Sequence, residues 1–224
     1  MRVFYHPSTH GSFLSKEESH HVKHVTRHTS GDMLTGFDGE GTEYTLRILE
    51  HQNRYTKVDV VRQQHFPLPG YSVTLIFSLF SPQRLEWAIE KATEVGVTSF
   101  IFTSTDYSQY PLSLGEKKYN RFRRITIAAC KQAERTYLPA ISLQSFEEVV
   151  TRHKGFVGMA YNARRMSEIC RSPTLSTLLI GPEGGFSPDE EERLISQFTP
   201  LTLGPHVQRA ETAAVVGPAL LLNL

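Results

Sequence analysis

The sequence predicts an α/β protein, in which a small β-rich unit precedes a larger domain built on a mostly parallel, helix-covered sheet. Three observations support this fold class. Within the first 66 residues, short β-branched and aromatic runs between Met33 and Val61 are separated by turn residues. The segment HFPLPGY, residues 65–71, holds two prolines and a glycine and is typical of a linker. From Tyr71 onward, apolar strands alternate with helical patterns. The expected domains are therefore residues 1–68 and residues 72–224.

The composition of the 224-residue chain excludes several classes of protein. A hydrophobic content of 39% and a charged content of 21% are ordinary for a globular protein with a real core. No apolar run is long enough to span a bilayer, and the start MRVFYHPSTH lacks the apolar region of a signal peptide. Two cysteines, Cys130 and Cys170, are too few for a disulfide scaffold. We therefore expect a cytoplasmic protein that does not enter membranes.

The first unit should contain a short helix followed by three strands. Ser15-Lys-Glu-Glu18 has the Ser-x-x-Glu form of a capping box, which predicts a helix start. The turn pairs Asp38-Gly39 and Glu40-Gly41 separate the first two of the strand-like runs. The strands are expected at residues 33–37, 44–49 and 55–61.

Three histidines in the first unit have a spacing that resembles a metal site. His20, His24 and His28 lie four residues apart and would share one face of a helix. Val25, Thr26 and Thr29 are poor helix formers, and no Glu or Cys accompanies the histidines in a known ligand pattern. We therefore expect surface or RNA-facing histidines and no metal.

The larger domain should alternate strands and helices along the chain. Ser81-Pro82 opens a helix that carries apolar residues at helical spacing, and a second helix is expected at residues 119–133. The strands are expected at residues 72–80, 97–103, 156–161, 175–180 and 201–203.

The second of these helices lies in a basic segment. Between Glu116 and Tyr137, seven lysines and arginines stand against two glutamates, which gives a local charge of +5 in a nearly neutral chain. Such a concentration is a footprint for phosphate, but an ordinary solvated helix face has the same pattern. The charge count alone leaves both interpretations open.

Two strands end in glycine-containing loops. LSTLLIG, residues 175–181, is followed by PEGGFSPDEEER, so bare backbone stands at the carboxyl end of a buried strand. Open α/β sheets bind ligands at that end. Ser187, Pro188 and Glu190 then form the cap of the next helix. The loop lacks the Lys-Ser/Thr pair of a phosphate-cradling loop, which argues against a triphosphate ligand.

The second glycine-ended strand, Leu201-Thr-Leu-Gly204, precedes a polar group of residues at the start of the last helix. Thr212 is expected as the N-cap of that helix, and Glu211 at its positive end. Gly217-Pro218 should interrupt and kink the helix.

These segments together resemble the ribosomal RNA uracil-N3 methyltransferases of the SPOUT superfamily, which act on 16S, small-subunit rRNA. The paired motifs LLIGPEGGFSPDEEE and LTLGPHVQRAETA carry the resemblance most specifically. LEWAIEKATEVGV, KQAERTYLPAI, HHVKHVTRHTSGD and FDGEG extend it over nearly the whole chain. The resemblance implies a PUA-like N-terminal β-barrel, and a C-terminal α/β domain with a deep trefoil knot that acts as a homodimer.

The resemblance also implies that both glycine-ended loops bind S-adenosylmethionine, mostly through backbone groups. The partner would be small-subunit rRNA or the assembled small ribosomal subunit. The cofactor-binding residues would be Ile180, Gly181, Pro182, Glu183, Gly184, Gly185, Leu203, Gly204, Val207 and Ala213.

Methyl transfer to uracil N3 requires alignment of the two reactants and loss of the N3 proton. The resemblance places Arg209, Glu211 and Thr212 where cofactor meets uridine. Arg209 suits stabilisation of the developing uracil anion, whereas Glu211 either takes the proton or holds Arg209. RNA-binding residues are expected at Arg27, Lys117, Lys118, Arg121, Arg123, Arg124 and Arg135. Two alternatives stay open: a SPOUT methyltransferase with another RNA target, and a catalytically silent ribosomal RNA-binding protein.

Overall fold

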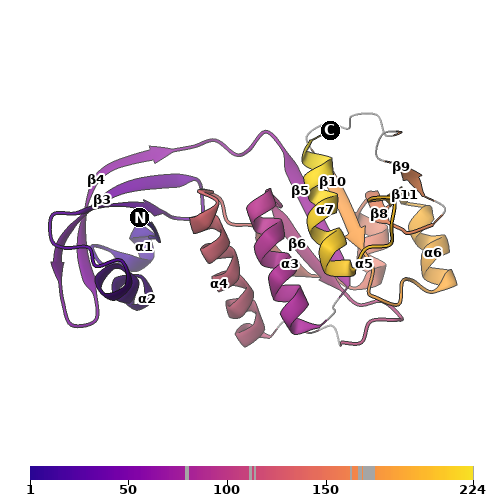
Figure 1. Ribbon diagram of the computed structural model, residues 1–224, viewed down its shortest axis with the longest axis horizontal. Helices are drawn as coiled ribbons and strands as arrows, with labels where there is room; N and C mark the ends of the chain where they lie inside the picture. The colour runs from indigo at the N-terminus through magenta and orange to yellow at the C-terminus, as the bar shows by residue number, and fades with distance from the viewer. Residues whose placement is uncertain are drawn as a thin grey trace. The chain divides into compact units, whose positions relative to one another are not determined.

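The computed structural model describes residues 1–78, 81–110, 113, 115–161, 163–165, 168 and 175–223. Figure 1 shows the course of the chain. The chain divides into two compact units. The first contains Met1–Leu68 and Cys130–Leu138, and the second contains Pro69–Ala129 and Pro139–Leu224. The segment Cys130–Leu138 thus packs with the first unit, although the sequence pattern suggested a contiguous division at the linker.

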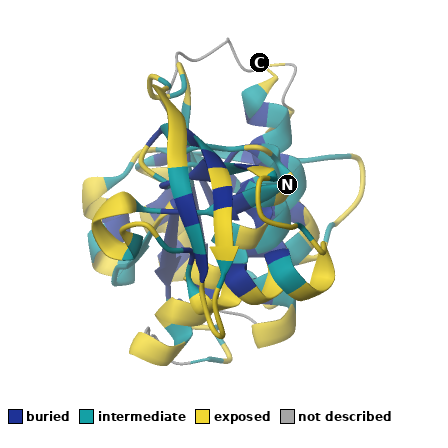
Figure 2. Cartoon of the chain, turned by 90° about the vertical axis from the view of Figure 1, so that its left-hand side faces the viewer, coloured by how far each residue is buried: buried dark blue, intermediate teal, exposed yellow. Residues whose placement is uncertain are grey.

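The first unit is built on a four-stranded sheet with the strand order β1-β2-β3-β4. β1 pairs in parallel with β2, whereas β2, β3 and β4 are antiparallel neighbours. Buried and more exposed residues alternate along β3 from Tyr44 to Ile48, as a half-buried strand requires. Figure 2, coloured by burial, views the chain from the side on which β3 and β4 lie in Figure 1. The bounds are β1 Arg2–Phe4, β2 Met33–Phe37, β3 Thr42–His51 and β4 Thr56–His65, of which β1 was not predicted.

Short helices precede β2. α1 is Pro7–His10, α2 is Lys16–His20, and a π-helical turn, η1, covers His21–Val25. The helical segment ends at Val25, so His28 lies outside it and the three histidines do not share one helical face. The rings of His20 and His24 still lie 5.0 Å apart. Among the described residues, no three His, Cys, Asp or Glu side chains come together in a way that suits a metal ion.

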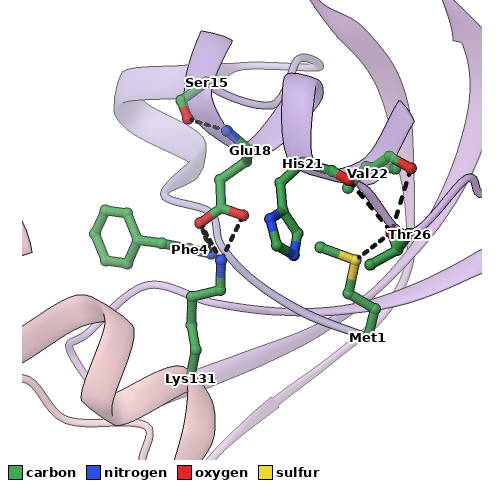
Figure 3. Close-up of polar contacts among 8 residues, drawn as sticks. All are labelled: Met1, Phe4, Ser15, Glu18, His21, Val22, Thr26 and Lys131. Carbon is green, nitrogen blue, oxygen red and sulfur yellow. Dashed lines mark hydrogen bonds and ion pairs between the residues drawn. The ribbon is translucent and has the colours of Figure 1, made fainter. Parts of the chain in front are cut away.

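The predicted capping box at Ser15 is formed only in part. The Ser15 hydroxyl accepts a hydrogen bond from the Glu18 backbone N–H at 3.1 Å, as predicted. The Glu18 carboxylate instead accepts two bonds from Lys131 Nζ, at 2.7 and 2.8 Å, and one from the Phe4 N–H at 3.2 Å (Figure 3). Lys131 lies in the last turn of α4, Glu116–Gln132. An acidic residue at the third helical position therefore serves tertiary structure rather than the cap.

The Glu18–Lys131 pair explains why the end of α4 belongs to the first unit, and it leads to a stability prediction. The two side chains are 10% and 23% exposed, respectively. Lys131→Met should leave a buried carboxylate without its cation and lower the free energy of unfolding by roughly 3 kcal/mol. Urea denaturation measures this change. Lys91→Met is the matched control, because Lys91 pairs with Glu90 and Glu94 on a more exposed surface and should cost less than about 1 kcal/mol. Equal losses in the two variants would contradict the prediction.

The second unit is built on a seven-stranded parallel sheet with the order β7-β6-β5-β10-β8-β11-β9. Its strands are β5 Ser72–Ser78, β6 Ser99–Thr103, β7 Ala140–Leu143, β8 Gly155–Gly158, β9 Arg164–Arg165, β10 Leu175–Ile180 and β11 Phe198–Thr202. Besides α4, its helices are α3 Pro82–Val95, α5 Phe146–Arg152, α6 Pro188–Ile195 and α7 Ala210–Leu222.

Alternate residues of the central strands enter two separate cores. Leu75 and Phe77 of β5 pack with α3, α4 and α7, whereas Ile76 packs with α5 and α6. Figure 1 shows α3, α4 and α7 on one side of the sheet. β5 and β10 are buried on both faces, which accounts for their near-continuous apolar sequences. These apolar runs were the basis on which both strands were predicted. None of the helices in the described part of the chain is long and apolar enough to cross a bilayer.

Several predicted elements differ from those observed. β7, β9 and α5 were not predicted, although Ser145 and Glu148 form a complete capping box at the start of α5. β11 begins three residues before the predicted strand, and β8 covers residues 155–158 only. The predicted extension of β5 through residues 79–80 lies outside the described residues.

The start of α7 corrects the expectation for Thr212. Arg209 is the N-cap residue, with extended backbone angles, and its carbonyl accepts a hydrogen bond from the Ala213 N–H at 2.9 Å. Thr212 therefore lies within the first turn. The helix also continues through Gly217 and Pro218, where an interruption was expected. Gly217 packs directly against the Leu178 side chain of β10, so a Cβ at this position would collide with it. Close packing on the sheet accounts for the glycine.

Candidate functional site

A cavity of about 780 Å³ lies at the carboxyl ends of β8, β10 and β11 in the second unit. Its size is typical of a small-molecule site, and the carboxyl edge of a parallel sheet is where such ligands bind. Three chain segments, residues 158–161, 180–186 and 202–203 with 206–210, supply most of the wall. Glu191, Ile195 and Ala213 complete it. The predicted cofactor residues all line this cavity except Gly204.

The loop after β10 is shaped by its own glycines and by the cap of α6. The Gly185 N–H donates to the Pro182 carbonyl at 3.0 Å, and Gly185 has a φ of +74°, which favours glycine. Gly181 lies against the Phe186 ring, and a Cβ there would stand 2.8 Å from it. Ser187 and Glu190 form the predicted capping box. The loop therefore presents backbone to the cavity from a fixed turn.

The turn after β6 contacts this loop and the cap of α6. The sequence pattern did not identify this turn as part of the site. The Ser187 hydroxyl donates to the Asp106 carboxylate at 2.6 Å, and the Asp106 N–H donates to buried Glu190 at 2.8 Å. Tyr107 packs on Gly184, where an added Cβ would lie 3.2 Å from the Tyr107 Cβ. Gly184 thus makes room for the Tyr107 side chain as well as lining the cavity.

The second loop runs from Leu203 to Arg209. The Gln208 amide donates to the Leu203 carbonyl at 3.2 Å, and the Thr202 hydroxyl donates to the Gly204 carbonyl at 2.9 Å. A Cβ at Gly204 would approach only the Gln208 amide nitrogen, at 3.0 Å. Gln208, which was not predicted, lines the cavity, and its Oε1 is buried with no hydrogen-bond partner among the described residues.

The three predicted catalytic residues do not lie together. Arg209 lines the cavity, but Glu211 and Thr212 are not among the residues that do. Because successive residues of a helix point about 100° apart, Arg209, Ala210 and Ala213 face the cavity, whereas Glu211 and Thr212 point away from it. Thr212 is exposed. Glu211 turns toward Arg84, whose Nε lies 3.6 Å from Glu211 Oε1.

Arg84 is a charged neighbour of the site that the sequence pattern missed. It lies in the first turn of α3, and its Nη1 donates to Glu183 Oε1 at 3.2 Å. Glu183 is part of the cavity wall. The helix start at Ser81-Pro82 was visible in the sequence, but nothing in the local pattern indicated which side chain of the first turn would reach the loop.

The predicted RNA-binding residues occupy both units. Arg27 lies in the first unit, is exposed and has a positive φ of 57°. Within α4, Arg121 makes two hydrogen bonds to Glu86, at 2.7 and 3.0 Å, and holds the pKa of that carboxyl below its ordinary value. Lys118 lies over the Phe122 ring, and burial lowers the pKa of this lysine. Lys117, Arg123 and Arg124 are exposed on the same helix, and Arg135 follows it in the first unit.

Cys130, at the end of α4, does not suit nucleophilic catalysis. It is buried, and burial raises the pKa of its thiol to about 11. Since the thiolate is the reactive form, this cysteine is chemically quiet near neutral pH.

The chain is similar in sequence and in structure to known RNA methyltransferases. Residues 67–222 match the family model for RNA methyltransferase domains. The ribosomal RNA small subunit methyltransferase E of Bacillus subtilis is 30% identical, over 89% of this chain and 85% of its own length. The protein of the same description from Aquifex aeolicus is 26% identical over 100% of both chains. The solved structure of a methyltransferase from Legionella pneumophila, in complex with the bound cofactor SAM, has a TM-score of 0.90 and 26% identity, covering 99% of this chain and 96% of that one.

Proposed function

Because the chain belongs to the ribosomal RNA small subunit methyltransferase E family of RNA methyltransferases, we propose that it methylates N3 of a specific uridine in small-subunit rRNA. The protein is an S-adenosylmethionine-dependent rRNA methyltransferase. The observation that carries the proposal is the cavity at the carboxyl edge of the sheet. It gathers the glycine-rich loop after β10, the loop after β11 and Arg209.

The residues of the cavity fit the cofactor. Gly185 has a left-handed backbone, lines the cavity and has no atom within 4 Å of the position of an added Cβ, so backbone can approach a ligand there. We propose that Ile180 to Gly185, Leu203, Val207 and Ala213 hold S-adenosylmethionine, which supplies an electrophilic methyl group on a positive sulfonium. The task of these residues is to fix the methyl group in line with the acceptor nitrogen.

Arg209 is the residue best placed to act on the acceptor. It lines the cavity, and its guanidinium is a planar donor that suits a uracil oxygen as negative charge develops on the ring. Glu211 and Thr212 lie off the cavity in this chain, so we assign neither a direct part in the reaction.

We further propose the architecture that the sequence motifs implied. The first unit would be a PUA-like barrel that binds RNA, and the second a knotted SPOUT domain working as a homodimer in the cytoplasm. One observation supports the knot: after β11, α7 returns to the middle of the sheet and packs on β5, β10 and α3.

The experiment that tests the proposed function combines binding with product analysis. Calorimetry should detect binding of S-adenosylhomocysteine, and mass spectrometry of small-subunit rRNA from a deletion strain should show the loss of one N3-methyluridine. No binding at high micromolar ligand would favour the silent RNA-binding alternative. Binding together with the loss of a different methylated nucleotide would favour another RNA target.

RNA affinity should depend on the exposed cations of α4. Replacing Lys117 and Arg124 with alanine should lower the salt slope of rRNA binding by about 0.7 to 0.9 for each phosphate that the variant no longer neutralises. Filter binding at several salt concentrations measures the slope. Arg121→Ala should have a smaller effect, because Arg121 is already paired with Glu86. Arg152→Ala on α5 is the control, and a slope equal to that of the control would contradict the prediction.

A further inference from the structure

One guanidinium contacts two chain segments beside the cavity. Arg84 donates through Nη1 to Glu183 Oε1 at 3.2 Å, and Glu183 belongs to the glycine-rich loop after β10. Through Nε, Arg84 lies 3.6 Å from Oε1 of Glu211, in the first turn of α7. Arg84 thus joins the loop to the start of the last helix.

The two carboxylates differ in their surroundings. The Glu211 side chain is 12% exposed, and its Oε2 is buried without a hydrogen-bond partner among the described residues. A carboxylate in that position depends on a nearby cation and on the positive end of α7. The Glu183 side chain is 34% exposed and lines the cavity. Arg84 therefore stabilises one carboxylate away from the cavity and offsets the charge of another on its wall.

Glu183 lines the cavity, so its charge would act on a ligand bound there. The methyl donor carries a positive sulfonium, whereas the product left after methyl transfer, S-adenosylhomocysteine, carries a neutral thioether. An uncompensated carboxylate on the wall would attract the donor and leave the product nearly unaffected. The charge balance between Arg84 and Glu183 is therefore a means of setting the preference between donor and product.

We propose that Arg84 is a positioning residue of the cofactor cavity. It holds the Glu183 carboxylate against the cavity wall, anchors that loop to Glu211 at the start of α7, and sets how strongly the cavity prefers the sulfonium donor over the thioether product. This proposal rests on the proposed function, since it requires that the cavity bind these two ligands.

The test is calorimetry with S-adenosylmethionine and S-adenosylhomocysteine on the full chain. Arg84→Met should raise the preference for the donor, expressed as the ratio of the two dissociation constants, by about three- to tenfold, because the Glu183 charge loses its partner. Adding Glu183→Gln to Arg84→Met should remove that gain. Arg84→Lys should stay within about twofold of the wild-type ratio, because the ratio depends on the positive charge beside Glu183 and not on the planar shape of the guanidinium.

Arg193→Met is the matched control. Arg193 has a similarly exposed side chain and pairs with Glu147, and neither residue lines the cavity. This variant should leave the ratio unchanged.

Each outcome bears on a separate point. If the wild type binds neither ligand, the proposed function fails and the role of Arg84 fails with it. If the wild type binds both, and Arg84→Met lowers the thermal midpoint without changing the ratio, Arg84 is a structural ion pair only and the proposal is overturned. A gain that persists after Glu183→Gln would also overturn it, because the charge would act through another group.

Discussion

Replacing Arg209 with alanine should raise the activation free energy of methyl transfer by about 2–4 kcal/mol and leave cofactor affinity nearly intact. The reason is that Arg209 faces the cavity but is expected to act on the uracil as charge develops, rather than on the cofactor. The Arg209 side chain makes no capping hydrogen bond to α7, so its removal should not disturb the start of the helix. Single-turnover methylation of rRNA, beside calorimetry with S-adenosylhomocysteine, separates the two effects.

Two further variants sharpen this test. Arg209→Lys should recover little activity, because a point charge does not reproduce a planar two-pronged donor. Arg193→Ala removes an arginine of α6 that does not line the cavity and should behave as wild type. If Arg209→Ala lost cofactor affinity in proportion to turnover, Arg209 would be a cofactor ligand and its assignment to the uridine would be wrong.

Replacing Gly185 with valine should abolish detectable cofactor binding, a loss of more than about 100-fold in affinity. Two effects combine at this position. A β-branched residue is strained at a φ of +74°, and its side chain would occupy the open space beside the loop in the cavity. Calorimetry with S-adenosylhomocysteine measures the loss, and circular dichroism checks that the fold is kept.

Two other glycines provide the comparison. Gly70→Val lies in the linker segment, where an added Cβ meets no atom within 4 Å, and it should bind as wild type. Gly204→Val should weaken binding less than Gly185→Val, because a Cβ at Gly204 meets only the end of the Gln208 side chain. An equal loss in the Gly185 and Gly204 variants would mean that both loops serve the cofactor through close backbone approach.

The parts of the fold that were predictable from sequence are those determined by local chemistry. The Ser187-Pro188-Glu190 cap and the buried strand before Gly181 depend on neighbouring residues, and the structure has both. The glycine-rich loop followed from the same local pattern, whereas its individual cofactor residues were implied only by the family resemblance. The position of this loop at the carboxyl edge of the sheet followed from the alternation of strands and helices.

The features that escaped prediction depend on contacts between distant segments. Ser15 and Glu18 have the sequence of a complete capping box, yet Lys131 and the Phe4 backbone take the Glu18 carboxylate, because a tertiary ion pair satisfies it better. Thr212 was predicted as the N-cap of the last helix, whereas Arg209 occupies that position and α7 begins at Ala210. Arg84 reaches Glu183 across a separation of 99 residues, and no window of sequence contains both.

The last turn of α4 also has a consequence for how the chain folds during synthesis. The first unit contains Cys130–Leu138. Within it, the Tyr137 hydroxyl donates to the Phe66 carbonyl at 2.9 Å and the Leu138 N–H to the Gly39 carbonyl at 2.9 Å. When only the first 68 residues have emerged from the ribosome, Lys131, Tyr137 and Leu138 have not yet been synthesised. Domains tend to fold as they emerge, so the first unit stays incomplete until the chain has been synthesised as far as Leu138.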